Sequence, residues 1–275
     1  MTTLYHADGT PLSFRALQQL QAMASIAIEY GRVNDADYYL VRIPRNTVDG
    51  RRLKPKVALT SADGSATGTK ISALNFARRE KPVFTMNAGL FNTGTMIPQG
   101  QTIVAGVSMT NSPMTDDMGS PISEDECYPL CIDGNGDLSA PYERTVDTAQ
   151  MIADGVRYAV TGWGQFIENF AKCDSAKYNE IVHAGTYIRQ SIGQYDNGDY
   201  FVCTVNKSRN GIAANDAGMT YDQLADLLIS RGVKFAYSLD GGGSCETVLG
   251  QRQINPIYEG SAGRAVPTVI FFEAE

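Results

Sequence analysis

Apolar and polar positions repeat with two different periods along the chain, and these periods predict an order of helices and strands. Residues 13–30 have the helical period and begin at Ser13, a favourable N-cap residue. Residues 71–79 predict a second, shorter helix. Two apolar segments, residues 38–43 and 83–86, have the length and composition of strands.

The second half of the chain is rich in strand-like segments that are separated by turns. Gly-rich turns at residues 133–137 and 196–199 lie between apolar flanks, and this pattern favours β-hairpins. The alternating oxygen-bearing residues of 133–137 also resemble part of a calcium loop. The bidentate glutamate and the rest of such a loop are missing, so the hairpin is the interpretation we adopt.

The clearest helix follows Thr220, which has the capping-box spacing to Gln223. Leucines at positions 224, 227 and 228 form an apolar stripe, and Gly232 ends the helix. The apolar segment 235–239 comes directly afterwards and predicts a buried strand.

Asp240 and three glycines stand at the end of that strand. Consecutive glycines lose much chain entropy on folding, so a structural or chemical requirement must maintain them. The N–H groups of Gly241, Gly242 and Gly243 can form a concave nest for an anion, and Ser244 adds a hydroxyl. A tight turn with a solvated Asp240 explains the same residues, and the motif alone does not decide between the two. It is not a P-loop, because no Gly-Lys-Ser/Thr follows.

Three further positions carry candidate chemistry. Asn87, followed by Gly89, ends an apolar strand, where its amide could bind a sugar or phosphate oxygen or simply cap a turn. Arg189 and Arg264 lie within or beside strand-like segments, and a planar guanidinium there suits an oxyanion such as phosphate. Each arginine could equally form a surface ion pair of little energetic value.

Composition removes several classes of function. The chain has 23 Lys and Arg against 30 Asp and Glu, a net charge of −7, so nucleic acid is not an expected partner. Its longest apolar runs, such as residues 269–272, are far shorter than the ~20 residues of a membrane span. The first residues lack the pattern of a secretory signal, so we expect synthesis in the cytoplasm without a signal peptide. Five dispersed cysteines argue against a disulfide framework, and Cys127 with Cys131 has no second close Cys/His pair to complete a zinc site.

Four of these segments, in the same order, resemble motifs of the phosphodiester glycosidase family, which includes the enzyme that removes N-acetylglucosamine from a mannose 6-phosphate diester. They are Asn-Ala-Gly-Leu-Phe at 87–91, Arg-Gln-Ser-Ile-Gly at 189–193, Gly-Met-Thr at 218–220 with Leu-Asp-Gly-Gly-Gly-Ser at 239–244, and Arg-Ala-Val-Pro at 264–267. The resemblance covers about residue 35 to the C-terminus. It implies a hydrolase that cleaves the bond between a sugar's anomeric carbon and a phosphodiester oxygen.

The resemblance also implies roles for individual residues. Asp240 becomes the carboxylate that acts on the sugar, as nucleophile or as base for water, and Glu246 a second carboxylate unless it faces solvent. Arg189 and Arg264 hold the phosphate beside Gly241–Gly243. Asn87 and Ser244 orient sugar or phosphate oxygens. The sequence requires no cofactor, and a divalent cation is compatible with it.

One segment departs from the family pattern. The family has Asp-Gly-Arg where this chain has Asn206-Lys207-Ser208-Arg209, and an asparagine cannot act as an acid or base. This departure supports an alternative function, a non-catalytic protein of the same fold that binds glycan or phosphate. A protein that sequesters nucleotides with its glycine nest is a third hypothesis. Small members without a signal sequence resemble those of viral genomes, which implies association with a virion, or release by lysis onto a cell-wall polymer.

The expected fold is α+β: one globular domain with mixed sheets over residues 35–275 and a helical extension over residues 1–34. We expect the phosphate-binding loops to collect at the C-terminal ends of strands. Neither His6 nor His183 has the surroundings of a catalytic triad. Trp163 could stack on a sugar or pack in the core. The sequence does not predict the oligomeric state.

Overall fold

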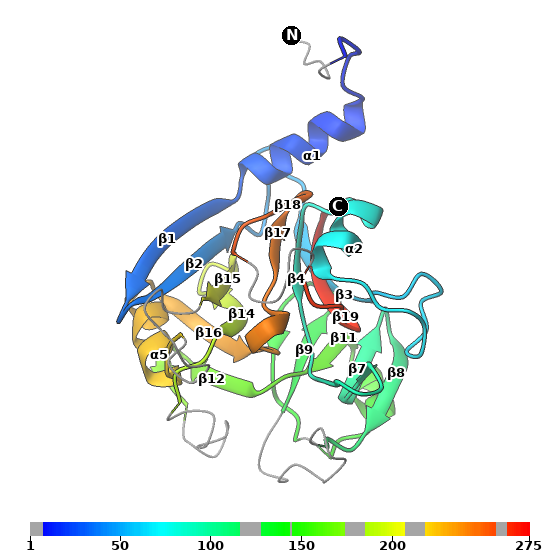
Figure 1. The fold of residues 1–275 in the computed structure, drawn as a ribbon, viewed down its shortest axis with the longest axis vertical. Helices are drawn as coiled ribbons and strands as arrows, with labels where there is room; N and C mark the ends of the chain where they lie inside the picture. The colour runs from blue at the N-terminus through cyan, green and yellow to red at the C-terminus, as the bar shows by residue number, and fades with distance from the viewer. Residues whose placement is uncertain (1–7, 116–127, 144, 174–184, 207–217, 257–262) are drawn as a thin grey trace.

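The computed structural model describes residues 8–115, 128–143, 145–173, 185–206, 218–256 and 263–275. In this part of the chain, three large sheets enclose a shared core and short helices lie at their margins (Figure 1). The α+β class is confirmed. The expectation of mixed sheets is wrong in one respect: every strand pair among the described residues is antiparallel.

The largest sheet has seven strands, and it carries most of the elements that matter for function. Its strands in spatial order are β1 (Ala27–Val33), β2 (Ala36–Ile43), β15 (Tyr200–Val205), β14 (Arg189–Tyr195), β16 (Val233–Ser238), β12 (Gly164–Glu168) and β13 (Ala171–Lys172).

Two five-stranded sheets and one small ribbon complete the β structure. The first is ordered β10 (Leu138–Ser139), β9 (Pro129–Asp133), β11 (Val156–Thr161), β7 (Gly100–Val104) and β8 (Val107–Ser112). The second is ordered β18 (Arg252–Gln253), β17 (Thr247–Leu249), β4 (Phe84–Asn87), β19 (Thr268–Ala274) and β3 (Leu53–Leu59). The ribbon pairs β5 (Phe91–Asn92) with β6 (Ile97–Pro98).

The helices in the described residues are short. They are α1 (Phe14–Ala24), α2 (Ala73–Glu80), α3 (Thr148–Ala153), α5 (Tyr221–Ser230) and a single 3₁₀ turn, η2 (Gly242–Ser244). None of the described helices is long and apolar enough to cross a bilayer. The predicted capping box at Thr220 is confirmed, since Thr220 and Gln223 cap each other at the start of α5.

The predicted helix over residues 13–30 is wrong beyond Ala24. Ser13 caps α1 as expected, but residues 27–33 form β1, which is hydrogen bonded along its whole length to β2. Tyr30 lies opposite Tyr39, and their rings are 5.3 Å apart, so cross-strand packing overrides the weak helical pattern there. The boundary at residue 34 stays a prediction, although β1 belongs to the largest sheet and only α1 stands away from it (Figure 1).

Both predicted hairpins are confirmed. Residues 133–137 connect β9 to β10, and the Asp133 carboxylate accepts hydrogen bonds from the N–H groups of Asn135 and Asp137 at 2.8 Å each. Residues 196–199 connect β14 to β15. In the first turn, Asp133 thus stabilises the backbone, as aspartate commonly does in turns.

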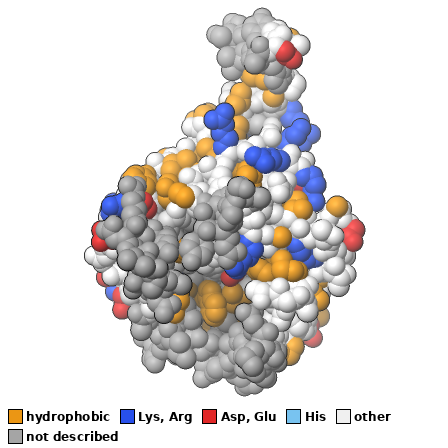
Figure 2. Space-filling view, viewed as in Figure 1, with side chains coloured by type: hydrophobic (Ala, Val, Ile, Leu, Met, Phe, Trp, Pro, Cys, Tyr) orange, Lys and Arg blue, Asp and Glu red, His pale blue; other side chains and the backbone are white. Residues whose placement is uncertain are grey.

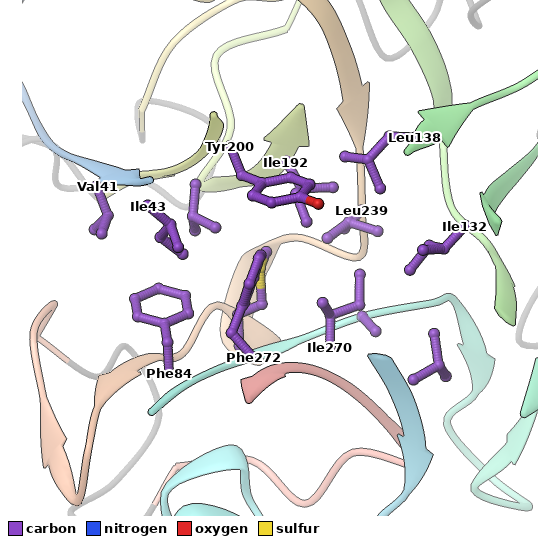
Figure 3. Packing of buried hydrophobic residues seen from close by; sticks show 14 of the residues in the cluster. Val41, Ile43, Phe84, Ile132, Leu138, Ile192, Tyr200, Leu239, Ile270 and Phe272 are labelled. Carbon is purple, nitrogen blue, oxygen red and sulfur yellow. The ribbon is translucent and has the colours of Figure 1, made fainter. Parts of the chain in front are cut away.

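The main core lies between the largest sheet and the two five-stranded sheets (Figure 3). Ile192 and Tyr200 of the largest sheet face Ile270 and Phe272 of β19, and the Tyr200 and Phe272 rings meet edge to face at 5.2 Å. On the opposite face of the largest sheet, Leu224 and Leu228 of α5 belong to a second buried cluster. The central strands β14 and β15 of this sheet are therefore buried on both faces.

Gly193 in the middle of β14 is a sensitive position. A Cβ there would lie 1.9 Å from the Phe235 carbonyl oxygen and 2.4 Å from the Phe201 ring. We expect Gly193→Ala to reduce the free energy of unfolding by at least about 2 kcal/mol, measured by urea denaturation. Gly134→Ala is the matched control, because the nearest atom to its Cβ is 3.9 Å away. A loss of equal size in both variants would contradict the packing of β14 against β16.

Candidate active site

The start of β14 and the end of β16 lie at the same edge of the largest sheet, because these neighbours are antiparallel. Arg189 is the first residue of β14, and Asp240 follows the last residue of β16 by two positions. Asp240 and Asn87 come at the C-terminal ends of their strands, as predicted. Arg189 comes at an N-terminal end instead, and the antiparallel pairing places it beside Asp240.

Both residues line one cavity of about 310 Å³. The described residues that form its walls are Trp163, Tyr187, Ile188, Arg189, Tyr221, Ser238, Leu239, Asp240, Gly241 and Gly242. Of the predicted site residues, the structure thus brings Asp240, Arg189, Gly241 and Gly242 together on one surface.

The glycine run passes tightly against the backbone of Ile188. The Gly242 N–H donates to the Ile188 carbonyl at 2.9 Å, and a Cβ on Gly241 would come within 2.7 Å of that same oxygen. Gly242 has φ +60°, a left-handed conformation that favours glycine. The N–H groups of Asp240, Gly242 and Ser244 all donate to protein carbonyls, so any anion nest is smaller than the run of glycines suggested.

Arg189 is a buried cation held in one orientation. Its side chain is only 3% exposed; Nε donates to the Met219 carbonyl at 2.6 Å and Nη2 to the Gly185 carbonyl at 2.8 Å. The guanidinium carbon lies 3.7 Å from the centre of the Tyr221 ring, a close cation–π contact. Burial lowers the pKa of Arg189 from its ordinary value, but a guanidinium keeps its proton in proteins.

Asn87 lies behind the glycine run rather than in the cavity. Its side chain is fully buried: Nδ2 donates to the Asp240 carbonyl at 2.7 Å, and Oδ1 accepts from the Glu246 N–H at 3.1 Å. One amide therefore connects both ends of the segment from 240 to 246. Gly89 is also buried, and a Cβ there would meet the Thr161 carbonyl at 3.0 Å. These placements favour a positioning role for both residues over direct contact with substrate.

Glu246 is buried beneath the same segment, at the N-terminus of α2. It is 2% exposed, and its Oε2 accepts from the Leu74 N–H at 3.0 Å. No described group forms a hydrogen bond to its Oε1. Burial raises the pKa of Glu246, an effect that the N–H groups of Leu74 and Ala73 and the Ser72 hydroxyl partly offset. The carboxylate faces a helix terminus, so its placement favours a positioning role over the catalytic role that the sequence suggested.

Ser244 and Arg264 lie beside the cavity. Arg264 Nη1 donates to Ser244 Oγ at 3.4 Å. The charges of Asp240, Arg189 and Arg264 all act on the pKa of the buried Cys245 thiol, which burial raises well above its ordinary value. The three charged groups are therefore all near enough to Cys245 for their charges to influence its thiol.

The aromatic walls of the cavity are the part that sequence reasoning largely missed. The sequence predicts sugar stacking or core packing for Trp163, but it indicates no role for Tyr187 or Tyr221. Tyr187 precedes Arg189 by two positions, so strand alternation alone could have placed both on one face. Tyr221 directly follows the Thr220 cap, and its hydroxyl hydrogen bonds to that of Ser238 on β16. Only the tertiary fold shows this contact.

Several predicted features lie outside the described residues: His6, His183, Cys127 and the family departure at 207–209. Asn206 is described, and its N–H donates to the Asp37 carbonyl at 2.8 Å. Among the residues that the structure describes, no three His, Cys, Asp or Glu side chains gather to hold a metal ion.

A larger cavity, of about 670 Å³, lies at the far ends of β12, β14 and β16 and contains none of the predicted site residues. Two of its cations already pair with carboxylates in its own wall, Arg45 with Asp137 at 2.5 Å and Lys234 with Asp196 at 2.9 Å. The smaller cavity, which contains Asp240 and Arg189, is therefore the better candidate for the active site.

The fold and this site define a class of α+β protein with a carboxylate, a glycine loop and a buried arginine at one sheet edge. Residues 80–273 match the family model described as phosphodiester glycosidase, and the chain belongs to that family.

Three known proteins show how far the similarity extends. The catalytic domain of the zebrafish N-acetylglucosamine-1-phosphodiester alpha-N-acetylglucosaminidase, solved in a form auto-inhibited by its pro-peptide, has a TM-score of 0.64 at 17% identity, covering 90% of this chain and 82% of that one. A hypothetical protein from Synechocystis also has a TM-score of 0.64, at 12% identity, covering 92% of this chain and 62% of that one. The SPbeta prophage-derived uncharacterized protein YomE of Bacillus subtilis (strain 168) is 28% identical over 136 residues. That match covers 49% of this chain and only 20% of the prophage protein. The two structures establish likeness of fold.

The placement of Glu246 gives a pH-dependent prediction. A carboxyl whose pKa is raised by folding stabilises the protein while it is protonated, and this contribution is lost as the pH rises through the raised pKa. Glu246→Gln does not ionise, so its Tm should rise relative to wild type as the pH increases from 4 to 8. Because the side chain lies behind the loop, we expect any hydrolytic activity of the protein to change by no more than about threefold.

If Glu246 were catalytic, activity would instead fall by about 10²-fold or more, whereas the Tm difference would not distinguish the two roles. Glu273→Gln is the control, because that carboxylate is half exposed and pairs with Lys56.

Proposed function

We propose that this protein is a hydrolase that cleaves the bond between the anomeric carbon of a sugar and a phosphodiester oxygen. The observation that carries the proposal is the single cavity that holds Asp240, Arg189 and the glycine loop between aromatic walls. Membership of the phosphodiester glycosidase family supports the reaction class, and the name of the zebrafish enzyme suggests an N-acetylglucosamine phosphodiester as the first substrate to test.

The two halves of such a substrate need different surroundings, and the cavity offers both. A pyranose ring has apolar faces that pack well on aromatic side chains, which Trp163 and Tyr187 supply. The phosphate needs fixed positive charge, which Arg189 supplies from within the wall and Arg264 from beside it. Gly241 lets the substrate approach the backbone closely, and Ser244 holds Arg264 in place.

In the reaction, the bond between C1 and the phosphate oxygen breaks and the phosphate leaves with the bonding electrons. A phosphate monoester is a good leaving group, so stabilising its charge matters more than protonating it. Water supplies the new oxygen on C1. The Asp240 carboxylate either removes a proton from that water or first bonds to C1 and is released by water afterwards. NMR of the released sugar separates these routes, because the first inverts and the second retains the anomeric configuration.

The relation to a prophage protein supports a proposed role in the viral attack on a host surface glycopolymer, from a virion or after lysis. We propose a divalent cation only as an optional component of the site. Activity measured with and without a chelator tests whether it is needed. We propose no nucleic acid and no membrane as partners.

The alternative function, non-catalytic binding of a glycan phosphate, is favoured by one observation. Asn206 stands where the family carries the aspartate of Asp-Gly-Arg. If that aspartate is essential, the cavity binds its ligand and does not turn it over.

We expect Asp240→Asn to reduce kcat for a methyl diester of N-acetylglucosamine 1-phosphate by about 10³-fold or more, since the amide can neither attack C1 nor deprotonate water. Free sugar is measured with and without EDTA, and ligand affinity is measured by calorimetry. The Kd should change by less than about tenfold, because the aromatic and arginine contacts remain.

Asp35→Asn is the matched control. It makes the same chemical change in the exposed turn between β1 and β2, at a left-handed residue with φ 65° that asparagine tolerates. Wild-type protein that binds sugar phosphodiesters but releases no sugar from any of them would establish the binding function instead.

A further inference from the structure

Four exposed basic residues gather around the base of α1 and along α2: Arg15, Arg78, Lys81 and Arg252. We call them the basic track. None of them forms an ion pair with a described carboxylate. The chain as a whole has a net charge of −7, so unpaired positive charge here is a local feature and not a general one.

Figure 2 shows how charged side chains are distributed on one face of the molecule. Lys and Arg side chains form a row from the base of α1 toward the middle of the face, while Asp and Glu side chains lie mainly at its margins. Such a separation of charge creates a local positive potential that attracts anions even to an acidic protein.

Three residues of the basic track, Arg15, Lys81 and Arg252, line two adjoining grooves beside α1. One groove, of about 390 Å³, lies between Met23 of α1 and the turn that leads to Arg252. The other, of about 460 Å³, is lined by Arg15 and shares Lys81 with the first.

The positive charges of Arg15 and Lys81 in the second groove are not neutralised by the acidic residues that line it. Glu273 and Glu275 line this groove, but two lysines offset their side-chain carboxylates: Lys56 pairs with both, at 3.0 and 2.7 Å, and Lys54 pairs with Glu275 at 3.2 Å. Arg15 and Lys81 therefore keep their charge available to a ligand.

Two elements connect the grooves to the candidate active site. Strand β17 begins immediately after Glu246 and ends at the first groove. Helix α2 packs beside it through Leu74, Ala77 and Val248, starting over the Glu246 carboxylate and ending at Lys81. Eight helical residues span about 12 Å, so the grooves begin roughly that far from the segment that carries Asp240. Arg78 lies between them, near enough for its charge to act on the pKa of Glu246.

We propose that the basic track binds further phosphates of a polymeric substrate, so that the preferred substrate is a chain of sugars joined through 1-phosphodiesters rather than a single diester. This inference rests on the proposed function for the reaction at Asp240. A monomeric diester has one negative charge, which the arginines of the site already match. A polymer carries one charge per repeat, and the track supplies cations along the path that the rest of the chain would follow.

The chemistry of the site selects this polyanion over nucleic acid. In a nucleotide the anomeric carbon bonds to a base nitrogen, and the phosphates are on other carbons. A nucleic acid therefore has no bond of the proposed type to place at Asp240, whereas a poly(glycosyl 1-phosphate) has one at every repeat.

The test compares a polymer of N-acetylglucosamine 1-phosphate with its single methyl diester. The variant is Arg15→Gln combined with Lys81→Gln and Arg252→Gln, all in exposed side chains away from the cavity. We expect kcat/KM for the polymer to fall about tenfold at low ionic strength, and less at high salt, because electrostatic steering is screened. The value for the monomer should stay within about twofold.

A control with the same charge change combines Arg157→Gln, Lys172→Gln and Lys234→Gln, which lie outside the track. An equal loss in this control would overturn the proposal, as would a wild-type enzyme that shows no preference for the polymer. Duplex DNA that inhibits polymer cleavage at a lower phosphate concentration than the polymer itself requires would assign the track to nucleic acid and overturn it too.

Binding separates this proposal from the proposed function. Fluorescence anisotropy with labelled polymer and the Asp240→Asn protein measures polymer binding by the basic track in the absence of turnover. If the wild type cleaves nothing but the triple substitution weakens polymer binding about tenfold, the hydrolase proposal fails and polymer recognition by the track is supported. If the triple substitution leaves polymer binding unchanged, the proposal for the basic track is wrong, whether or not the protein is a hydrolase.

Discussion

The close approach of the glycine run to the Ile188 carbonyl is the constraint on which the site depends. That one oxygen accepts the Gly242 N–H at 2.9 Å and leaves no room for a Cβ on Gly241. The contact joins the end of β16 to the start of β14, and it thereby sets Asp240 and Arg189 in the wall of one cavity. A residue with a side chain at position 241 would push Asp240 and Arg189 apart. Glycine is therefore required here for steric reasons, independently of any role in binding an anion.

Buried polar contacts hold the other side of this loop. Asn87 connects the Asp240 carbonyl to the Glu246 N–H, and Gln190 donates to Thr247 at 3.0 Å while it accepts from Thr204 at 2.8 Å. These side chains join the largest sheet to the sheet of β4 and β17 directly beneath the cavity. Breaking one partner of a buried pair leaves the other unsatisfied, at a cost of ~1–3 kcal/mol, so the network favours a single loop geometry.

The sequence was informative where the signal is local. The cap at Thr220, the hairpins and the strand before Asp240 follow from neighbouring residues, and the structure has them. Residues 27–33 show the limit, since their place in β1 depends on cross-strand pairing with β2 and not on a clear helical or strand pattern of their own. Asn87 shows it again. Its position at a strand end was predicted, but its two buried partners are 153 and 159 residues away and could not be.

The fold places positive charge in two different environments, one buried and one exposed. Arg189 is buried at a position where desolvation disfavours its charge, and two backbone carbonyls and the Tyr221 ring compensate for the lost water. A cation prepared in this way does not need to reorganise when an anion arrives, which is what stabilisation of a departing phosphate requires. The exposed cations near α1 are different in kind, because solvent screens them and they act at long range. Under the proposed function, the buried cation would stabilise the departing phosphate, and the exposed cations would raise the local concentration of an extended anion before one of its bonds is cleaved.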